Sequence, residues 1–283
     1  MLLHLARMAR QSTGSCMGGG VAANCVGIGI GIGIGRIVEE GIFEEVFVPP
    51  APGDSGTAIG AAAAVHLATT PQLLRGIEGA CYLGPSWPSP VIGRNSRPGF
   101  RVRQLPSDRA EFLATQFARG QIVGLFQGRV EAGPRALGNR SILASPLSEG
   151  VIDRLNATVK FREPFRPFAP VVPEEHAAEY FTLGQAVPFM SMASQVTAKA
   201  REQIPAIVHA NGTARVQTVR PDQNPMLHAV LTTFAKLTGV PVLINTSLNV
   251  KGKPICGTPD MTLDCRTDSG LDALLLEDWW VTK

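Results

Sequence analysis

The sequence predicts an α/β or α+β protein with a central sheet, and two observations support this fold class. Short apolar runs typical of buried strands alternate with segments of helical apolar period, and several runs end in polar residues suited to bind ligands at strand ends. Hydrophobic residues make up 45% of the 283 residues and charged residues 17%, which suits a protein with a sizeable core. This length has room for one large domain or two smaller ones.

The amino-terminal part is predicted to alternate helices and short strands, and residues 15–24 are predicted as a short strand that runs into a glycine turn and the start of a second helix. Residues 1–13 have an amphipathic helical period, and Gly14 is placed to end that helix. Residues 46–48 are predicted as a strand, and after a loop rich in proline and glycine a helix of small residues covers 57–68. Residues 27–35 alternate Gly and Ile, but the third glycine of the Gly-x-Gly-x-x-Gly dinucleotide pattern is missing, so low-complexity filler is the favoured interpretation.

Residues 69–106 have the composition of a linker, with prolines and scattered glycines, so a domain boundary is predicted there. The elements predicted after it are a helix over 107–119 with Ser107 as its N-cap, a buried strand over 121–126, a helix over 149–159, a strand over 169–172, a short helix over 176–181, an extended segment over 189–193, a hairpin over 208–219 that turns at Asn211–Gly212, a helix over 225–238 closed by Gly239, and a strand over 240–249.

Composition argues against several function classes. The net charge of +3 is mild and no broad basic surface is indicated, so no nucleic-acid partner is predicted. No apolar segment approaches the ~20 residues that cross a membrane. The five cysteines form no Cys-x-x-Cys pair, which argues against a zinc ribbon or a disulfide framework and favours a cytoplasmic location. The five histidines form no metal-binding pair, so no metal site built wholly within this chain is expected.

Two short runs, residues 127–140 and 160–167, concentrate cations beside rigid turns. They contain Arg129, Arg135, Arg140, Lys160, Arg162 and Arg166. A solvated helix face would mix Lys with Glu at spacings of three and four, whereas these runs favour Arg and avoid that spacing. Guanidinium forks bind phosphate oxygens bidentately, so the runs predict a site for phosphorylated small molecules. The alternative is a set of structural Arg residues paired to carboxylates.

Two glycine turns in the amino-terminal part are candidate nucleotide or metal positions. The first contains Gly19, Gly20 and Asn24, where glycines let backbone N–H groups approach a nucleotide; a tight packing turn between strand and helix is the alternative. The second places Asp54 between two glycines, just ahead of a helix. Its carboxylate is suited to bind a metal or nucleotide-bound Mg²⁺, and equally to cap that helix.

Four longer motifs follow one another along the second half of the chain. They are Gly-Arg-x-Glu-x-Gly-Pro-Arg-Ala-Leu-Gly-Asn-Arg-Ser-Ile-Leu-Ala, Lys-x-Arg-Glu-x-Phe-Arg-Pro-Phe-Ala-Pro, Gly-Thr-Ala-Arg-Val-Gln-Thr-Val and Asn-Thr-Ser-x-Asn. These motifs resemble the O-carbamoyltransferases of antibiotic and nodulation-factor biosynthesis. Within them, Lys160-x-Arg162 and Ser247-x-Asn249 resemble the Lys-x-Arg and Ser-x-Asn signature of the YrdC family. The segments around the two glycine turns resemble the closing part of the first carbamoyltransferase domain.

The resemblance implies a YrdC-like domain with a mixed twisted sheet, preceded by part of an actin/Hsp70-type ATPase domain. Residues 1–75 would be the remnant of that first domain, 76–106 a linker, and 107–283 the YrdC-like domain. It also implies a two-step reaction. Carbamoyl phosphate and ATP give carbamoyl-adenylate, and the carbamoyl group then passes to a hydroxyl of a small-molecule acceptor.

The resemblance also implies roles for single residues. Carbamoyl phosphate and the nucleotide phosphates would be held by Lys160, Arg135, Arg166 and Arg215. The carbamoyl or phosphate group would be hydrogen-bonded by Ser247 and Asn245, with Arg162 and Asn249 completing the signature and Glu131 orienting an arginine. The cofactor-binding residues would be Gly19, Gly20, Asn24, Gly53 and Gly56, and the metal ligand Asp54. The implied cofactors are ATP with Mg²⁺, and a divalent metal such as Fe²⁺ at the first-domain site.

The sequence departs from the family pattern in ways that bear on activity. The family's first domain is longer and supplies histidine ligands and a catalytic histidine ahead of the first glycine turn, whereas about 75 residues of it are present here. Asn211, Leu248 and Lys253 stand where Asp, Phe and Glu are usual. The prediction is an adenylating carbamoyltransferase that needs a separate amino-terminal subunit, or a homo-oligomer, for transfer. The alternative is a non-catalytic nucleotide- or phosphate-binding remnant.

Overall fold

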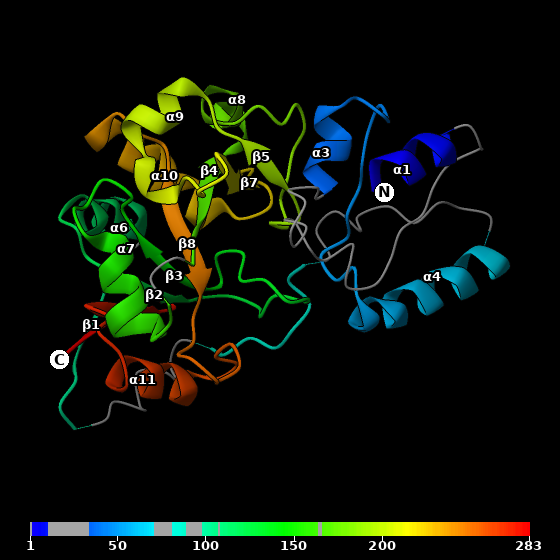
Figure 1. Cartoon of the computed structure of the whole chain (residues 1–283). Coiled ribbons are helices and arrows are strands. Elements are labelled where there is room, and N and C mark those ends of the chain that lie inside the picture. The colour runs from blue at the N-terminus through cyan, green and yellow to red at the C-terminus, as the bar shows by residue number, and fades with distance from the viewer. Residues whose placement is uncertain (1, 11–33, 71–80, 89–97, 107, 164–165) are drawn as a thin grey trace.

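A mixed eight-stranded sheet forms the centre of the protein, as the computed structural model shows for residues 2–10, 34–70, 81–88, 98–106, 108–163 and 166–283 (Figure 1). Its strand order is β1-β10-β9-β2-β3-β8-β4-β7. The strands are β1 Arg101–Gln104, β2 Val123–Phe126, β3 Arg140–Ala144, β4 Ala169–Pro173, β7 Gln217–Val219, β8 Leu243–Ser247, β9 Ala273–Leu276 and β10 Trp279–Thr282. Strands β5 Ala193–Gln195 and β6 Thr213–Arg215 form a separate antiparallel pair.

The direction of the strands makes the sheet mixed. The pairs β2–β9 and β4–β7 are parallel, and every other neighbouring pair is antiparallel. This arrangement confirms the predicted fold class. It also places β8 between β3 and β4, so that the polar end of β8 meets the loops that lead into both neighbours.

Helices cover both faces of this sheet. One face is covered by α6 Arg109–Ala118 and α10 Pro225–Thr238, and the other by α7 Val151–Arg154, the π-helical turn η3 Leu155–Lys160 and α11 Pro259–Thr267. The remaining helical elements of this part are η4 Glu174–His176, α8 Ala177–Tyr180, α9 Ala198–Gln203 and η5 Pro205–Ile207. Side-chain caps start α6, α9, α10 and α11, and a left-handed Gly239 ends α10 as predicted.

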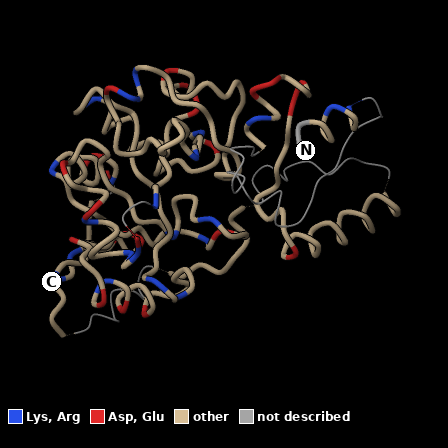
Figure 2. Tube along the Cα trace, viewed as in Figure 1, with Lys and Arg blue, Asp and Glu red and all other residues tan. Residues whose placement is uncertain are grey.

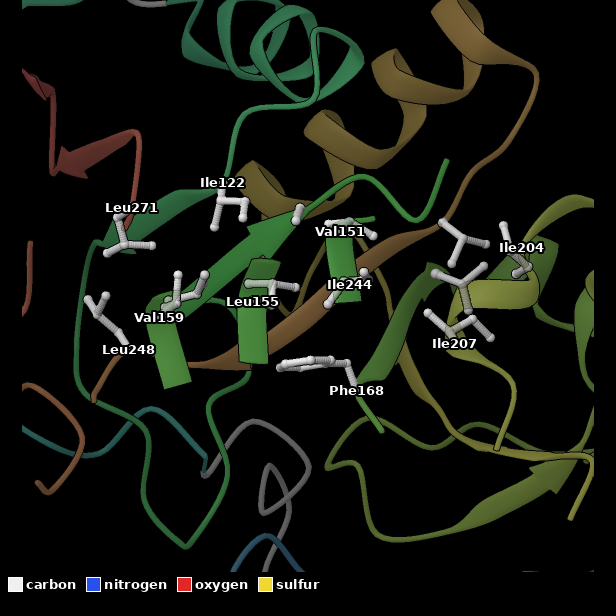
Figure 3. Close-up of a cluster of buried hydrophobic side chains, with 14 of the residues drawn as sticks. Ile122, Val151, Leu155, Val159, Phe168, Ile204, Ile207, Ile244, Leu248 and Leu271 are labelled. Carbon is white, nitrogen blue, oxygen red and sulfur yellow. The ribbon is translucent and has the colours of Figure 1, made fainter. Parts of the chain in front are cut away.

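Hydrophobic residues alternate between the two faces of the central strands, which is the period of an extended chain. In β9, Leu275 faces the core under α6 and α10, whereas Leu274 faces the core under η3 and α11. Figure 3 shows the second core, where Leu155 and Val159 of η3 pack over Ile244 of β8. Full burial of each such side chain stabilises the fold by about 1.5–3 kcal/mol. The sheet is therefore a rigid base for the loops at its edge.

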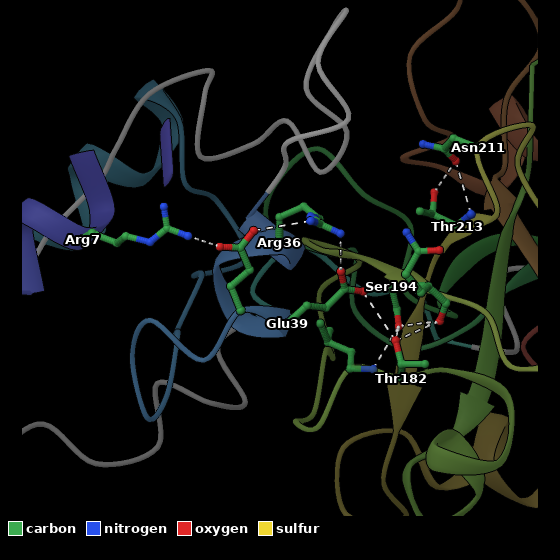
Figure 4. A network of polar contacts seen from close by, with 10 residues as sticks. Arg7, Arg36, Glu39, Thr182, Ser194, Asn211 and Thr213 are labelled. Carbon is green, nitrogen blue, oxygen red and sulfur yellow. Dashed lines mark hydrogen bonds and ion pairs between the residues drawn. The ribbon is translucent and has the colours of Figure 1, made fainter. Parts of the chain in front are cut away.

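The amino-terminal part packs against the sheet domain through a short helix and the segment that follows it, in which Val46 is hydrogen-bonded to Gln185 and the Phe47 ring contacts the Phe189 ring. It comprises α1 Leu2–Arg10, α3 Ile34–Glu39, η1 Asp54–Gly56 and α4 Thr57–Thr69. The Glu39 carboxylate accepts a hydrogen bond from the backbone N–H of Gln195 at 2.8 Å (Figure 4). Gly35 lies directly against the Ala193 carbonyl, where a Cβ atom would come within 1.8 Å. Glycine is required at this close approach.

Helix α4 extends away from the rest of the structure in Figure 1, and none of its residues is buried. Its sequence is nevertheless apolar, and Val65 and Leu67 are exposed to 65% and 51%. A helix that is apolar all round is normally a buried one. The isolated position of α4 is therefore unusual for its composition.

Several sequence expectations need correction. The predicted hairpin over 208–219 does form its turn, but Thr213–Arg215 pairs with β5, and Gln217–Val219 pairs with β4. Residues 46–48 are not in a strand. Residues 101–104, inside the predicted linker, form strand β1, and the sequence reasoning did not predict α11, β9 and β10. The N-cap of α6 is Asp108, not Ser107.

Some predicted positions lie outside the described residues. These are Gly19, Gly20, Asn24, Ser107 and most of the Gly-Ile run. Within the described part of the chain, no helix combines the length and apolarity needed to cross a bilayer. Figure 2 shows Lys and Arg interspersed with Asp and Glu along the described trace, in keeping with the mild net charge.

Candidate functional site

A cavity of about 390 Å³ opens where β8, β6 and the two cation-rich loops meet. Its size lies within the range of roughly 300–1,000 Å³ that is usual for small-molecule sites. The lining residues are Pro134, Arg135, Ala136, Arg162, Arg166, Pro167, Met190, His209, Arg215, Asn245, Thr246 and Ser247. Four of them are arginines, and no carboxylate is among these described lining residues. The cavity is therefore suited to a ligand with several negative charges.

The four arginines come from three separate segments of the chain. Arg135 lies in the loop between β2 and β3, Arg162 and Arg166 follow η3, and Arg215 ends β6. Burial together with the neighbouring charges of Arg166 and Arg215 lowers the pKa of Arg162 to about 10. The like charges thus lie close enough to repel one another. A bound phosphate would relieve that repulsion.

Arg162 is held in place by protein oxygens. Its Nε donates to Asn156 Oδ1 at 2.7 Å, its Nη2 donates to the Pro167 carbonyl at 3.2 Å, and the guanidinium carbon lies 4.2 Å from the centre of the Phe168 ring. Arg215 differs, because its Nε is buried without a hydrogen-bond partner among the described residues. An unpaired buried guanidinium N–H costs folding free energy and is expected to find its partner in a ligand.

Asn245 also presents an unused polar atom. Its Nδ2 donates to Gln217 Oε1 at 2.6 Å and to the Ala136 carbonyl at 3.3 Å, while Gln217 Nε2 donates to the Leu137 carbonyl at 3.0 Å. These carbonyl contacts fix the orientation of both amides. Asn245 Oδ1 is then a buried acceptor with no partner in the described structure. The cavity wall therefore offers an acceptor as well as cations.

Lys160, Ser247 and Asn249 form one hydrogen-bonded group behind the cavity. Lys160 Nζ contacts the Ser247 carbonyl, Ser247 Oγ at 3.2 Å, the Asn249 carbonyl at 3.0 Å and Asn249 Oδ1 at 2.8 Å. The Ser247 hydroxyl in turn donates to Asn249 Oδ1 at 2.6 Å. Of the three, only Ser247 lines the cavity. In this arrangement Lys160 acts on the cavity through Ser247.

The buried position of Lys160 changes its acidity. Lys160 is 6% exposed, and burial lowers the pKa of its ammonium group to about 7. The π-helical turn η3 delivers it there, and Phe161 then takes a left-handed conformation with φ 47°. A π-turn in place of a regular helical turn often marks a functional position.

Glu131 shapes the loop that carries Arg135. Its Oε1 accepts hydrogen bonds from the backbone N–H groups of Leu137 at 2.7 Å, Asn139 at 2.8 Å and Arg140 at 3.1 Å. Glu131 is 8% exposed, so these three amides have little access to water. The carboxylate therefore orders the backbone of the loop, whereas the sequence reasoning expected it to orient an arginine.

Besides Lys160, two more of the six predicted cations do not line the cavity. Arg140 is fully buried and donates to the carbonyls of Gln127 at 2.7 Å and Gly128 at 3.1 Å, with its guanidinium 3.6 Å from the Phe126 ring centre. Arg129 donates to the carbonyls of Leu83 at 2.8 Å and Gly84 at 2.9 Å. These two arginines are structural, but carbonyls rather than carboxylates pair with them.

Asp54 and its two flanking glycines lie at the start of α4 and do not line the cavity. Asp54 is exposed, and its backbone carbonyl accepts a hydrogen bond from Thr57 Oγ1 at 2.6 Å. Within the described residues no group of three or more His, Cys, Asp or Glu side chains is placed to hold a metal ion. The role of Asp54 as a metal ligand therefore stays a prediction. A metal ion bound by Asp54 would need further ligands that the described residues do not place beside it.

Sequence reasoning missed three residues that shape the site. His209 lines the cavity, Gln217 orients Asn245, and Asn156 holds Arg162. Gln217 stands inside the Gly-Thr-Ala-Arg-Val-Gln-Thr-Val motif, which was a usable signal. Nothing in the sequence near His209 or Asn156 indicates that the chain returns to the same cavity.

Comparisons with known proteins identify the family of the chain. A family model described as Carbamoyltransferase C-terminus matches residues 114–283, and one described as Carbamoyltransferase N-terminus matches residues 2–63. Nodulation protein NolO of Bradyrhizobium diazoefficiens is 37% identical over 292 residues, which cover 100% of this chain and 52% of that protein. Nodulation protein U of Rhizobium tropici is 40% identical over 230 residues, covering 80% and 37% respectively.

Among solved structures, full-length HypF in its phosphate- and nucleotide-bound form aligns with a TM-score of 0.41 and 14% identity, over 66% of this chain and 22% of that chain. The chain spans about half the length of the curated relatives it matches. Because the carboxy-terminal family match alone covers more than half of the sequence, the protein belongs to the carbamoyltransferase family.

Proposed function

We propose that this chain contributes the activating half of an O-carbamoyltransferase. It binds carbamoyl phosphate and ATP at the arginine-lined cavity and forms carbamoyl-adenylate. The carbamoyl group then passes to a hydroxyl of a small-molecule acceptor. The observation that carries the proposal is the convergence of Arg135, Arg162, Arg166 and Arg215 on one cavity that has no carboxylate among its described lining residues.

The chemistry of activation requires such a cluster of cations. Water attacks the phosphorus of carbamoyl phosphate, and the products are carbamate and inorganic phosphate. A carbamate oxygen then attacks the α-phosphorus of ATP, and pyrophosphate leaves. Both steps gather negative charge on phosphoryl oxygens, so cations fixed before the reaction lower its barrier without further reorganisation. Mg²⁺ bound with ATP would supply additional positive charge at the leaving pyrophosphate.

The site residues divide into three groups under this proposal. Arg135, Arg166 and Arg215 bind phosphoryl oxygens directly, and Arg162 adds charge from its fixed position. Asn245 Oδ1 and the Ser247 hydroxyl face the carbamoyl end of the ligand. Lys160 and Asn249 position Ser247. Hydrogen bonds thereby join Lys160 of the Lys-x-Arg pair to both residues of the Ser-x-Asn pair, which is remote in the sequence.

Transfer to the acceptor needs more of the first domain than the described residues provide. Helix α4 overlaps the matched amino-terminal family region over residues 57–63 and has no buried residue. The relatives are about twice as long as this chain. We therefore propose that a polypeptide that completes the first domain, as a separate subunit or a second copy, covers α4 and brings the acceptor site, including any metal at Asp54.

Binding of carbamoyl phosphate tests the proposal. We expect isothermal titration calorimetry to give one site per chain for carbamoyl phosphate. Methyl carbamate, which has the same carbamoyl group and no charge, should not bind detectably because the four arginines require an anion. Equal binding of the two compounds, or binding of neither, would contradict the proposed substrate.

The acidity of Lys160 predicts a pH dependence for this binding. Because its pKa is about 7, Lys160 is largely neutral at pH 8 in the ligand-free protein and protonated at pH 6. An added dianion attracts a proton and raises that pKa. Binding at pH 8 should therefore take up close to one proton, binding at pH 6 much less, and affinity should fall as pH rises above 7.

Calorimetry in two buffers of different ionisation enthalpy measures this uptake. His209 does not contribute between pH 6 and 8, because burial and the Arg215 charge hold its pKa near 4. The Lys160→Met variant should show no uptake in whatever binding remains. Proton uptake that is the same at pH 6 and pH 8 would show that the protonation of Lys160 does not change when the ligand binds.

The second candidate is a phosphate-binding remnant without turnover. Its support is that Lys160 makes all its contacts within the protein and that the described residues lack a metal cluster. This candidate also binds carbamoyl phosphate. The two readings differ in whether the chain forms pyrophosphate from ATP.

A further inference from the structure

His209 lies in the wall of the cavity and has no role in the function proposed above. It begins the turn that leads into β6, where its backbone N–H donates to the Thr213 carbonyl at 2.7 Å and its carbonyl accepts from the Gly212 N–H at 2.9 Å. These two bonds fix the backbone on either side of the imidazole. The ring is therefore held against the cavity by the turn.

A chain of hydrogen bonds determines which ring nitrogen of His209 carries the proton. Asn211 accepts through one side-chain atom from the backbone N–H of Thr213 at 3.2 Å, so that atom is the oxygen. The same oxygen lies 2.7 Å from Thr213 Oγ1, so the threonine hydroxyl must donate its single hydrogen to it (Figure 4). Thr213 Oγ1 then has only lone pairs left for His209 Nδ1, 3.1 Å away.

His209 Nδ1 must therefore be the donor, which leaves Nε2 of the neutral ring as an acceptor. Burial and the positive charge of Arg215 both oppose protonation of the ring, since they lower the pKa of His209 to about 4. No described residue forms a hydrogen bond with Nε2. The cavity wall thus holds a second acceptor besides Asn245 Oδ1, among groups that otherwise donate.

We propose that His209 Nε2 accepts a hydrogen bond from the amino group of the carbamoyl ligand and selects carbamoyl phosphate over acyl phosphates that lack an N–H donor. Thr213 and Asn211 are positioning residues, because they hold the tautomer and do not touch the ligand. This inference rests on the proposed function. Asn211 supplies the oxygen that an aspartate would also supply, so the departure at this position preserves the hydrogen-bond chain.

Acetyl phosphate is the matched probe, because it has the same phosphoryl group and a methyl group in place of the amino group. A site built to accept an N–H rejects the analogue that leaves its acceptor unpaired. We expect calorimetry on the wild-type chain to give at least tenfold tighter binding of carbamoyl phosphate than of acetyl phosphate. The ratio should fall to about two or less in His209→Leu.

Two further variants separate this role from a general effect on the cavity. His209→Gln keeps an acceptor near the position of Nε2 and should retain most of the selectivity. Thr213→Val removes the acceptor for Nδ1–H, so the other tautomer gains population and the ratio should fall while binding of inorganic phosphate stays within twofold. A loss of affinity for both acyl phosphates by one common factor in His209→Leu would overturn the inference.

Nitrogen-15 spectra of the wild-type chain test the tautomer without any substitution. We expect a protonated Nδ1 and an unprotonated Nε2 for His209 at neutral pH, and the reverse assignment would overturn the inference. If the wild-type chain binds neither acyl phosphate, the proposed function fails and this inference with it. If carbamoyl phosphate binds but the ratio is near one, only the role of His209 is wrong.

Discussion

Replacing Arg215 with Met should weaken binding of carbamoyl phosphate about a hundredfold and should not destabilise the protein. The guanidinium is a ligand-facing charge with a buried, unpartnered Nε, and a charge-assisted hydrogen bond contributes about 1.5–3 kcal/mol. A hundredfold change corresponds to about 2.7 kcal/mol. Removing one of several repelling cations should leave the melting temperature unchanged or raise it. Calorimetric titration and thermal unfolding measure the two effects.

Arg119→Met is the matched control for this variant. Arg119 is exposed at the end of α6, on the opposite side of the sheet from η3, and does not line the cavity. Its replacement should change neither the affinity for carbamoyl phosphate nor the melting temperature. A melting temperature that drops by 5 °C or more in Arg215→Met, with affinity unchanged, would mean that Arg215 is a structural residue.

Replacing Glu131 with Ala should have the largest effect on stability, a loss of about 3–5 kcal/mol in the free energy of unfolding. Three backbone N–H groups would lose their common acceptor in a buried loop, and the buried Arg140 charge would lose its nearby anion. The loop also carries Arg135, so affinity for carbamoyl phosphate should fall as well. Urea unfolding measures the first effect and calorimetry the second.

Glu131→Gln separates the hydrogen bonds from the charge. The amide oxygen can still accept from the three N–H groups, so this variant should lose about half as much stability as Glu131→Ala. If Glu131→Ala remains within 1 kcal/mol of the wild-type chain, the loop is held by other contacts, and the role assigned to this carboxylate is wrong.

The strands β2, β4 and β8 and most of the helices that cover the sheet could be predicted because local signals determine them, whereas β1, β3, β9 and β10 were not predicted. The apolar run over 121–126 was predicted as a buried strand and contains β2, and Gly239 ends α10 in the left-handed conformation that glycine favours. The pairing of Thr213–Arg215 with β5 could not be predicted, since a hairpin signal gives the turn but not the partner strand.

The candidate site, like the fold, could be predicted only in part. Arginine clustering beside proline and glycine indicated a phosphate site, and the structure brings Arg135, Arg162 and Arg166 to one cavity. Arg140 has the same sequence surroundings but is turned inward onto Phe126 and backbone carbonyls. The directions of these side chains depend on contacts that no sequence pattern indicates, here the hydrogen bonds of the Glu131 carboxylate to the backbone of Leu137, Asn139 and Arg140.

Isotope exchange between pyrophosphate and ATP tests the central claim most directly, because it reports formation of an acyl-adenylate without needing the acceptor. We predict exchange that requires carbamoyl phosphate, that is lost in Lys160→Ala and that persists in Arg119→Met. Absence of carbamoyl-phosphate-dependent exchange in a folded chain that binds both substrates would contradict activation by this chain and would favour the phosphate-binding remnant.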